Sequence, residues 1–204
     1  MHLYSLIIVS LGRMMSKVYP QQRTASSNLM GYGRETYTIW MKSLIFHSNG
    51  CTVYNSNGDI VYRVDNYDKK GTTQVNLMDL QGRVLCTIHK RFLGFGGWDV
   101  YKCISHEKAW FQVKRCYNKM MIMGKVTWQI MLGCQKYSIH RIGGKIAFMI
   151  INIDGDVVAS AKQKHTSSGI VLGNDVLTLE VEADVDHSLI MAFVTVFGLI
   201  CGRM

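Results

Sequence analysis

The sequence predicts a mainly β fold, a closed antiparallel barrel of about twelve strands around a buried hydrophobic helix at the C-terminus. Short runs of β-branched and aromatic residues recur along the chain at regular spacing, with turn signals between them. Nineteen glycines against one proline allow many tight turns and leave backbone donors free for sheet pairing. A C-terminal run is apolar on every side of a helix, and a barrel of more than about eight strands needs such a filling.

The strands are recognised by alternation of apolar and polar residues. Tyr37, Ile39 and Met41 occupy alternate positions, which is the period of a strand with one buried face. We expect strands at residues 36–41, 51–54, 60–65, 73–78, 84–89, 99–104, 109–115, 120–128, 135–141, 145–151, 157–164 and 176–182.

One nine-residue pattern occurs three times, at residues 53–61, 77–85 and 150–158. Each copy has two apolar residues, an Asn or Asp, two spacers, a Gly, a charged residue and two aliphatic residues. The Asn or Asp can bond the turn backbone and the Gly supplies a positive φ, so we interpret each copy as a hairpin turn. Asp154 and Asp156 suggest a Ca²⁺ site, but the pattern offers fewer than the roughly six oxygens that this cation needs.

Residues 189–200 form the apolar run. A helix of this length is about 18 Å long, whereas a bilayer core is about 30 Å thick, so we predict a core helix and no transmembrane span. Asp186 or Ser188 is expected to cap its start. A Ser-His-Asp triad at 186–188 is disfavoured, because triad members meet in space and are seldom consecutive. The predicted core residues of the helix are Leu189, Ile190, Phe193, Val196, Phe197 and Ile200.

The chain is expected to consist of a flexible N-terminal arm, residues 1–30, and one domain, residues 31–204. Residues 1–11 could pass as the apolar part of a signal peptide, but no Lys or Arg precedes them and no small-x-small site follows. We therefore favour a start of translation at Met14 or Met15, with residues 1–14 as an upstream extension.

Six cysteines are too few for a disulfide scaffold, and none has zinc-ligand spacing. The chain also lacks an Asn-x-Ser/Thr sequon. Both features fit a reducing compartment, so we expect free thiols and a cytoplasmic location, at the membrane surface or in the nucleus. Cys86 and Cys134 are expected to behave as small apolar residues.

The net charge of +9 is concentrated in the middle of the chain. Residues 81–150 carry 12 basic and 2 acidic residues, net +10. Such a segment suits an anionic partner, although Lys and Arg also solvate the outer wall of a barrel, and both explanations stay open. The candidate residues for contact with a lipid head group or another anion are Lys90, Arg91, Lys114, Arg115 and Lys119, with Phe92, Trp110, Phe111 and Tyr117 beside them.

No catalytic residue and no cofactor is predicted. The chain has no Walker, Rossmann, G-x-S-x-G or H-E-x-x-H pattern. Carboxylates are scarce in the middle of the chain, so a paired acid and base would be hard to build there.

Several stretches resemble the plant LURP-one-related (LOR) family over roughly residues 15–204. They are Trp40-Met41-Lys42-Ser43-Leu44, Val61-Tyr62-Arg63-Val64-Asp65-Asn66-Tyr67, Asn76-Leu77-Met78-Asp79-Leu80-Gln81-Gly82-Arg83 and Leu172-Gly173-Asn174-Asp175-Val176-Leu177-Thr178-Leu179. Gly96-Gly97-Trp98 departs from the family's usual Gly-Arg-Trp and removes one basic side chain.

The resemblance implies a tubby-like fold, a twelve-stranded barrel around a C-terminal helix. It also implies a relation to phospholipid scramblases and to membrane-tethered tubby-like transcription factors, and a role in plant defence. The leading hypothesis is a non-enzymatic protein that binds anionic phospholipid, such as a phosphoinositide, or a partner protein. The alternative is a nuclear factor that binds DNA or protein; an enzyme or scramblase is disfavoured.

Overall fold

The computed structural model describes residues 33–42, 49–66, 74–91, 97–103, 108–116, 127–143 and 147–203. All of them belong to the compact unit Gly31–Met204. The predicted arm and upstream extension lie outside the described residues and stay predictions.

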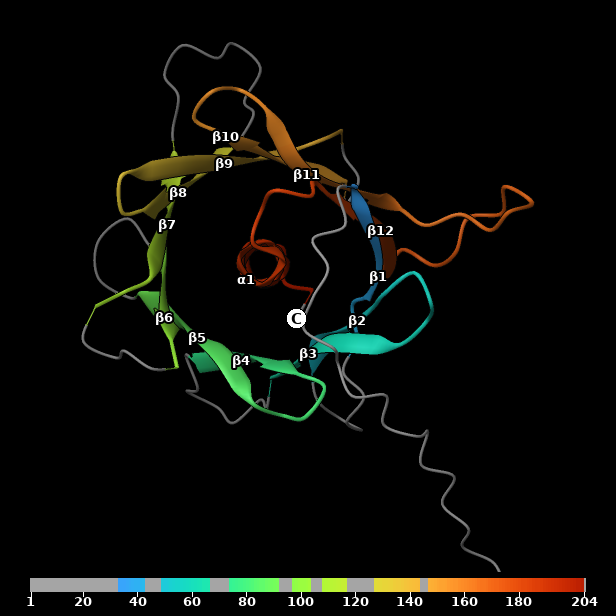
Figure 1. The fold of residues 1–204 in the computed structure, drawn as a ribbon, viewed down its shortest axis with the longest axis horizontal. Coiled ribbons are helices and arrows are strands. Elements are labelled where there is room, and N and C mark those ends of the chain that lie inside the picture. The colour runs from blue at the N-terminus through green and yellow to red at the C-terminus, as the bar shows by residue number, and fades with distance from the viewer. Residues whose placement is uncertain are drawn as a thin grey trace, which may run out of the picture. The chain divides into compact units, whose positions relative to one another are not determined.

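Twelve strands form one closed barrel, and the predicted fold class is confirmed (Figure 1). Each strand pairs antiparallel with the next along the chain, and β12 closes the ring by pairing with β1. The strands are β1 (Glu35–Trp40), β2 (Asn49–Tyr54), β3 (Ile60–Asn66), β4 (Gln74–Asp79), β5 (Val84–Arg91), β6 (Gly97–Lys102), β7 (Phe111–Cys116), β8 (Thr127–Leu132), β9 (Gln135–Arg141), β10 (Phe148–Asn152), β11 (Val157–Gln163) and β12 (Val176–Val181).

The barrel has two different ends, because successive strands run in opposite directions. We call the end where the odd-numbered strands finish the loop end, and the opposite end the turn end. The connection of residues 164–175, between β11 and β12, leaves from the loop end. Residues 43–48, 67–73, 92–96, 117–126 and 144–146 also belong to connections between strands that meet at this end, and they lie outside the described residues.

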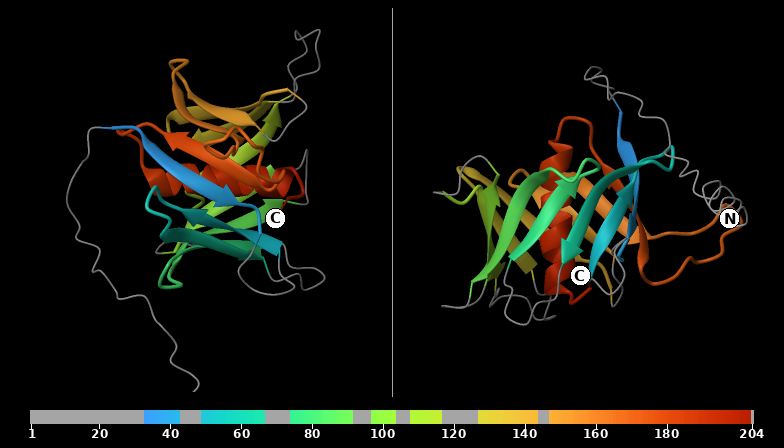
Figure 2. Two further views of the ribbon diagram at one scale, coloured as in Figure 1. Left: turned by 90° about the vertical axis from the view of Figure 1, so that its right-hand side faces the viewer. Right: turned by 90° about the horizontal axis from the view of Figure 1, so that it is seen from below.

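The helix α1 (His187–Ile200) fills the barrel, as the sequence predicted (Figures 1 and 2). It starts at the turn end, where β12 finishes, and ends at the loop end. Asp186 is its N-cap, and Oδ1 of this residue accepts hydrogen bonds from the backbone N–H groups of Ser188 (2.9 Å) and Leu189 (3.2 Å). Ten consecutive residues from Leu189 to Gly198 are buried.

The side chains of α1 pack against the inner faces of the strands. Phe193 meets Phe111 edge to face with ring centroids 4.9 Å apart, and Phe197 lies 4.4 Å from the ring of Phe148. Of the six predicted core residues, five are buried and Ile200, in the last turn, is half-buried. No helix in the described part of the chain is long and apolar enough to cross a membrane.

The three repeated patterns form hairpin turns at the turn end, as predicted. Asn55 Oδ1 accepts hydrogen bonds from the backbone N–H groups of Asn57 and Asp59, both at 2.9 Å. Asn152 bonds its own turn in the same way, and Asp79 Oδ1 accepts from the N–H of Arg83. The glycine of each copy has a positive φ, between 79° and 93°. The Asn and Asp side chains therefore stabilise the turns by accepting hydrogen bonds from their backbone.

Two expectations about β8 and its turn need correction. The strand expected at 120–128 lies farther along, at Thr127–Leu132, while 120–126 lie outside the described residues. The apolar alternation continues through Ile130 to Leu132, and Gly133 with φ +57° makes a tight turn into β9. Cys134 is exposed in this turn, so the expectation that it behaves as a small apolar core residue was wrong.

Gly97 is the first residue of β6. A Cβ at this position would lie 2.6 Å from both Arg91 Nη2 and the carbonyl oxygen of Val113. The Arg91 guanidinium thus occupies the space next to residue 97, which explains why this chain carries glycine there.

Replacing Phe193 with Ala should lower the free energy of unfolding by about 3–5 kcal/mol, because this side chain of α1 is fully buried against the inner face of the strands. Ile153→Ala is the control, since Ile153 is 64% exposed in the turn after β10, and it should change stability by less than about 0.5 kcal/mol. Urea denaturation measures both. A Phe193→Ala loss below about 1 kcal/mol would contradict a packed helix inside the barrel.

The six thiols are all free and should react at different rates. Burial raises the pKa of Cys51 to about 12, and the charge of Asp65 adds to this. Burial also raises the pKa of Cys86 to about 12, with Lys102 opposing. A short alkylation pulse followed by peptide mapping should therefore modify Cys103 and Cys134 first. Cys86 reacting as fast as Cys134 in the folded protein would show that the barrel opens there.

Candidate functional site

The two ends of the barrel differ in charge. Arg63 lies in the middle of β3, and the ion pair Lys162–Glu180 joins a residue near the loop end of β11 to one near the turn end of β12, so these three residues are left out of this comparison. Among the other described residues, the loop end carries eight basic and three acidic side chains, net +5, and the turn end carries five basic and eight acidic ones, net −3. The basic residues of the loop end are Lys42, Lys90, Arg91, Lys114, Arg115, Arg141, Lys164 and Arg203.

Each acidic residue of the loop end has a basic partner. Asp65 Oδ2 lies 3.4 Å from Arg63 Nε, and Asp99 Oδ2 lies 3.4 Å from Arg91 Nε. Asp175 Oδ2 lies 3.1 Å from Lys42 Nζ, and the hydrogen bond from Lys42 is the main cause of the lowered pKa of this carboxyl. The acids are thus neutralised locally, and the field that remains at this end is positive.

Lys90 and Arg115 lie on the inner face of the barrel, at its mouth. Residues opposite each other in a sheet point to the same face. Lys90 pairs with Trp98, which pairs with the buried Val113. Arg115 pairs with Trp128, which pairs with the buried Ile139. Both basic residues are exposed, so their side chains extend from the mouth into solvent.

Each of these two basic residues stands beside a half-buried tryptophan. Lys90 Nζ lies 5.9 Å from the ring centroid of Trp98, within the range of a cation–π contact. Trp128 lies opposite Arg115 on the neighbouring strand. Basic side chains next to half-buried indoles form a surface that suits the boundary between lipid head groups and acyl chains.

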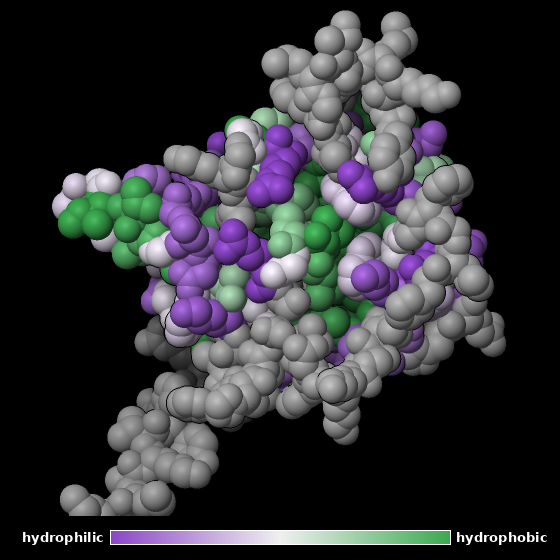
Figure 3. All heavy atoms as spheres, turned by 180° about the vertical axis from the view of Figure 1, so that it is seen from behind, coloured by the Kyte–Doolittle hydropathy of each residue, from purple (hydrophilic) through white to green (hydrophobic). Residues whose placement is uncertain are grey.

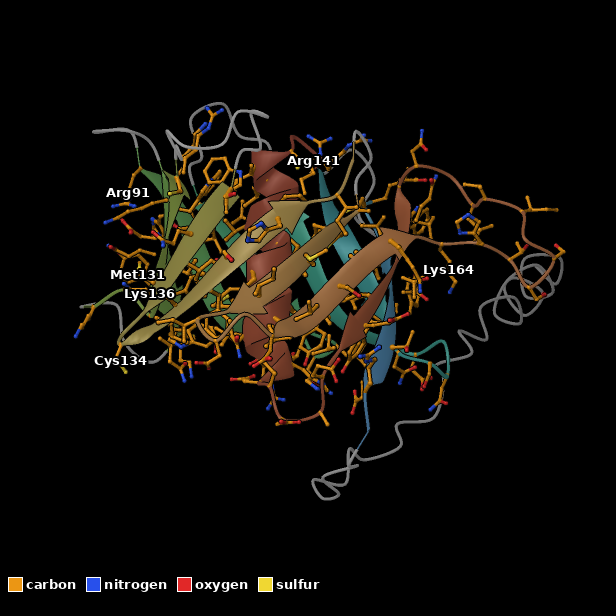
Figure 4. The ribbon with its side chains drawn as sticks, turned by 90° about the horizontal axis from the view of Figure 1, so that it is seen from above. Arg91, Met131, Cys134, Lys136, Arg141 and Lys164 are labelled. Carbon is orange, nitrogen blue, oxygen red and sulfur yellow. The ribbon has the colours of Figure 1, made fainter. Side chains whose placement is uncertain are left out.

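Arg141 belongs to the same mouth, although sequence reasoning did not select it. It pairs with the buried Phe148 and is exposed, so it also stands on the inner face at the rim (Figure 4). Burial raises the pKa of Cys201, next to the end of α1, while Arg141 and Arg203 lower it. Both arginines therefore lie close to the helix end. In the sequence, Arg141 stands two positions after the apolar Ile139, which indicates that both face the same side of the strand. The strand order is needed to show which residues lie beside Arg141.

We define the rim cluster as Lys90, Arg115 and Arg141. Figure 3 looks onto the loop end and shows apolar side chains at its centre with polar ones around them. Charge, aromatic rings and an apolar centre are thus combined at one end of the barrel. In the sequence, the connections at this end contain five more lysines and one aspartate.

The other predicted residues lie elsewhere. Arg91 and Lys114 are each one position from the rim cluster along their strands and therefore face outward. Arg91 is half-buried and lies against Asp99 and the carbonyl of Val113, which makes it a structural cation of the wall. Lys114 is exposed on the outer wall, and Lys119 lies outside the described residues.

The aromatic residues expected beside the basic cluster do not lie there. Phe111 is buried against Phe193, and Trp110 lies at the turn end, where Lys102 Nζ is 4.4 Å from its ring centroid. Phe92 and Tyr117 fall outside the described residues. The aromatic residues beside the basic residues of the loop end are instead Trp98 and Trp128.

The turn end holds a compact polar cluster of Glu35, Tyr37 and His187. Tyr37 Oη donates to Glu35 Oε2 (2.5 Å) and lies 2.7 Å from His187 Nδ1. Burial and the contact with Glu35 raise the pKa of Tyr37, so its phenol stays protonated at neutral pH. These contacts fix the start of α1 against β1. Within the described ranges, no group of three or more His, Cys, Asp or Glu side chains could hold a metal ion.

The comparisons with known proteins agree with one another. A model of the LURP-one-related family matches residues 35–198. LURP-one-related protein 4 of Arabidopsis thaliana is 47% identical, over 92% of this chain and 88% of its own length. LURP-one-related protein 11 of the same plant is 35% identical, over 91% and 89%. An X-ray structure of another Arabidopsis thaliana protein has the same fold, with a TM-score of 0.58, 15% identity, and coverage of 83% of this chain and 92% of that one.

Arg91→Ala should lower the free energy of unfolding by about 1–3 kcal/mol, because it leaves the half-buried Asp99 and a strand carbonyl without their partner. Lys114→Ala is the matched control on the outer wall and should stay within about 0.5 kcal/mol. Thermal and urea unfolding measure both variants. Equal stabilities would mean that Arg91 is not a structural residue.

Proposed function

The chain belongs to the LURP-one-related family, and from this premise and the geometry above we propose that it is a non-enzymatic module whose loop end binds anionic phospholipid reversibly. The observation that carries the proposal is the rim cluster on the inner face of the mouth. Three basic side chains stand there on the alternate strands β5, β7 and β9, and two tryptophans lie beside Lys90 and Arg115. Basic residues that only solvate the wall of a barrel would face outward. These three residues instead lie on the inner face, in register with core residues.

The strength of such binding can be estimated. Each Lys or Arg near an anionic surface contributes about 1 kcal/mol, and salt screens the attraction within a Debye length of about 8–10 Å. The rim cluster alone would then give weak, salt-sensitive attachment. That fits a protein that moves on and off the cytoplasmic face of a membrane, which is the location we propose.

The resemblance to tubby-like membrane-tethered transcription factors and phospholipid scramblases bears on the wider role. We propose that the protein attaches to a membrane in a regulated way and has a role in plant defence signalling. A phosphoinositide is the favoured ligand, because its several phosphate groups can be contacted by more than one basic side chain along the rim.

The second candidate is a nuclear factor whose loop end contacts DNA or a partner protein. The same net charge of +5 at this end would attract a phosphate backbone. Against it, the rim cluster surrounds a barrel mouth, and the described helix α1 is buried inside the barrel, where it cannot enter a DNA groove. Binding to duplex DNA at physiological salt would distinguish this candidate.

Lys90→Glu/Arg115→Glu should weaken partitioning onto vesicles of phosphatidylcholine with phosphatidylinositol bisphosphate by about 30-fold or more. The loss of two contacts accounts for this figure, and charge reversal adds repulsion. Co-sedimentation at two salt concentrations measures it, and the salt dependence should become shallower in the variant.

The control is Lys108→Glu/Lys136→Glu, which makes the same charge change at the turn end on two exposed lysines. It should bind almost as well as the unmodified protein. Circular dichroism and melting temperature check that both variants fold. Equal losses in the two variants would show that only net charge matters, and no binding by the unmodified protein would overturn the proposal.

A further inference from the structure

The C-terminal end of α1 is held in a fixed geometry at the loop end. The backbone N–H of Gly202 donates to the carbonyl of Leu199 at 3.2 Å, and that of Arg203 donates to the carbonyl of Gly198 at 2.9 Å. With Gly202 at a φ of +63°, these two bonds form a Schellman motif, which ends the helix in a sharp turn. The backbone of Arg203 is therefore placed by main-chain bonds, and its side chain is not needed for them.

The register of the strands brings Arg141 to the same place. Arg141 pairs with Phe148 on β10, and the ring of Phe148 lies 4.4 Å from the ring of Phe197 in α1. The carbonyl of Phe197 accepts a hydrogen bond from the N–H of Cys201, the C-cap of the helix, at 3.0 Å. Arg141 therefore stands beside the last turn of α1, as Figure 4 shows.

The thiol of Cys201 is close to both arginines. Burial raises the pKa of this thiol, while the charges of Arg141 and Arg203 lower it. The cysteine is half-buried, and both arginines are exposed. Two guanidinium groups that the solvent can reach thus act on one sulfur atom at the end of the helix.

The elements around this point carry no carboxylate side chain. Residues 108–153, which include β7–β10, and residues 187–204, which include α1, contain no Asp or Glu. Elsewhere at the loop end, Lys42 and Arg91 each neutralise an aspartate. The half negative charge at the end of a helix offsets only part of two guanidinium charges, so an anion with more than one charge suits this position.

We propose that Arg141 and Arg203 bind one phosphate monoester group at the end of α1, and that this contact selects phosphoinositides among anionic lipids. The inference rests on the proposed function and assigns its specificity to a site. A phosphate monoester has three acceptor oxygens and nearly two negative charges, and a guanidinium can donate two parallel hydrogen bonds to such a group. Phosphatidylserine has a phosphate diester and a carboxylate but no phosphate monoester, so charge alone would attract it to the rim cluster.

Arg203→Lys tests the site, because it keeps the charge and the main-chain cap but removes the guanidinium. Titration calorimetry with soluble inositol 1,4,5-trisphosphate should show about tenfold weaker binding, through the loss of one bidentate contact. Lys136→Gln, at an exposed lysine of the turn end, is the control and should stay within about twofold. On vesicles, Arg203→Lys should weaken binding to phosphatidylinositol bisphosphate and leave binding to phosphatidylserine at equal surface charge unchanged.

Cys201 gives a second measurement in the folded protein. A bound phosphate neutralises the two guanidinium groups that lower the pKa of the thiol, so the thiolate fraction falls. Alkylation of Cys201, measured by peptide mapping, should slow by about threefold or more in saturating inositol trisphosphate. Cys134, exposed at the turn end, is the internal control and should react at an unchanged rate.

The outcomes separate this site from the proposed function. Phosphoinositide vesicle binding that Arg203→Lys leaves unchanged, or equal losses on the two lipids, would overturn the site and leave the proposed function standing. An unchanged alkylation rate of Cys201 in saturating inositol trisphosphate would also overturn the site. Binding of inositol trisphosphate with the expected loss in Arg203→Lys, together with no binding to any vesicle, would support the site for a soluble phosphate and overturn the attachment to membranes.

Discussion

Filling the interior of a twelve-stranded barrel is the constraint on which the rest of this structure depends. Side chains of the strands alone cannot fill a barrel this wide, so a helix buried on every side has to occupy it. The chain supplies that helix last, directly after β12. Because β12 finishes at the turn end, α1 must enter there, and its C-terminus must emerge at the loop end. The connectivity therefore fixes which terminus of α1 lies at each end of the barrel.

The polarity of α1 matches the charges at the two ends. Its N-terminus, which carries about half a positive charge, lies among the carboxylates of the turn end, with Asp186 as the cap. Its C-terminus lies among the basic residues of the loop end, close to Arg141 and Arg203. The tight Asn and Asp turns also lie at the turn end. The connection of residues 164–175 and the rim cluster lie at the loop end.

The fold could be predicted from the sequence because its signals are local: alternation in the strands, the Asn or Asp turn pattern and the apolar run of α1. The site could be predicted only in part. Lys90 and Arg91 are neighbours in the sequence, but adjacent strand residues face opposite sides, so one reaches the mouth and the other supports the wall. Arg141 stands alone in the sequence and joins the rim cluster only through the strand order. Trp98 and Trp128 were missed for the same reason.

The rim cluster places three like charges at the mouth of the barrel. Like charges brought together oppose the compact state, and the half negative charge at the end of a helix offsets only a small part of a net +5. Arg91 and Lys42 each neutralise a carboxylate, so folding explains them. Lys90, Arg115 and Arg141 stand in register with core residues, in positions where apolar side chains would extend the barrel interior. A chain that keeps basic residues there gives up apolar packing at the mouth, and the proposed anionic ligand would account for their position.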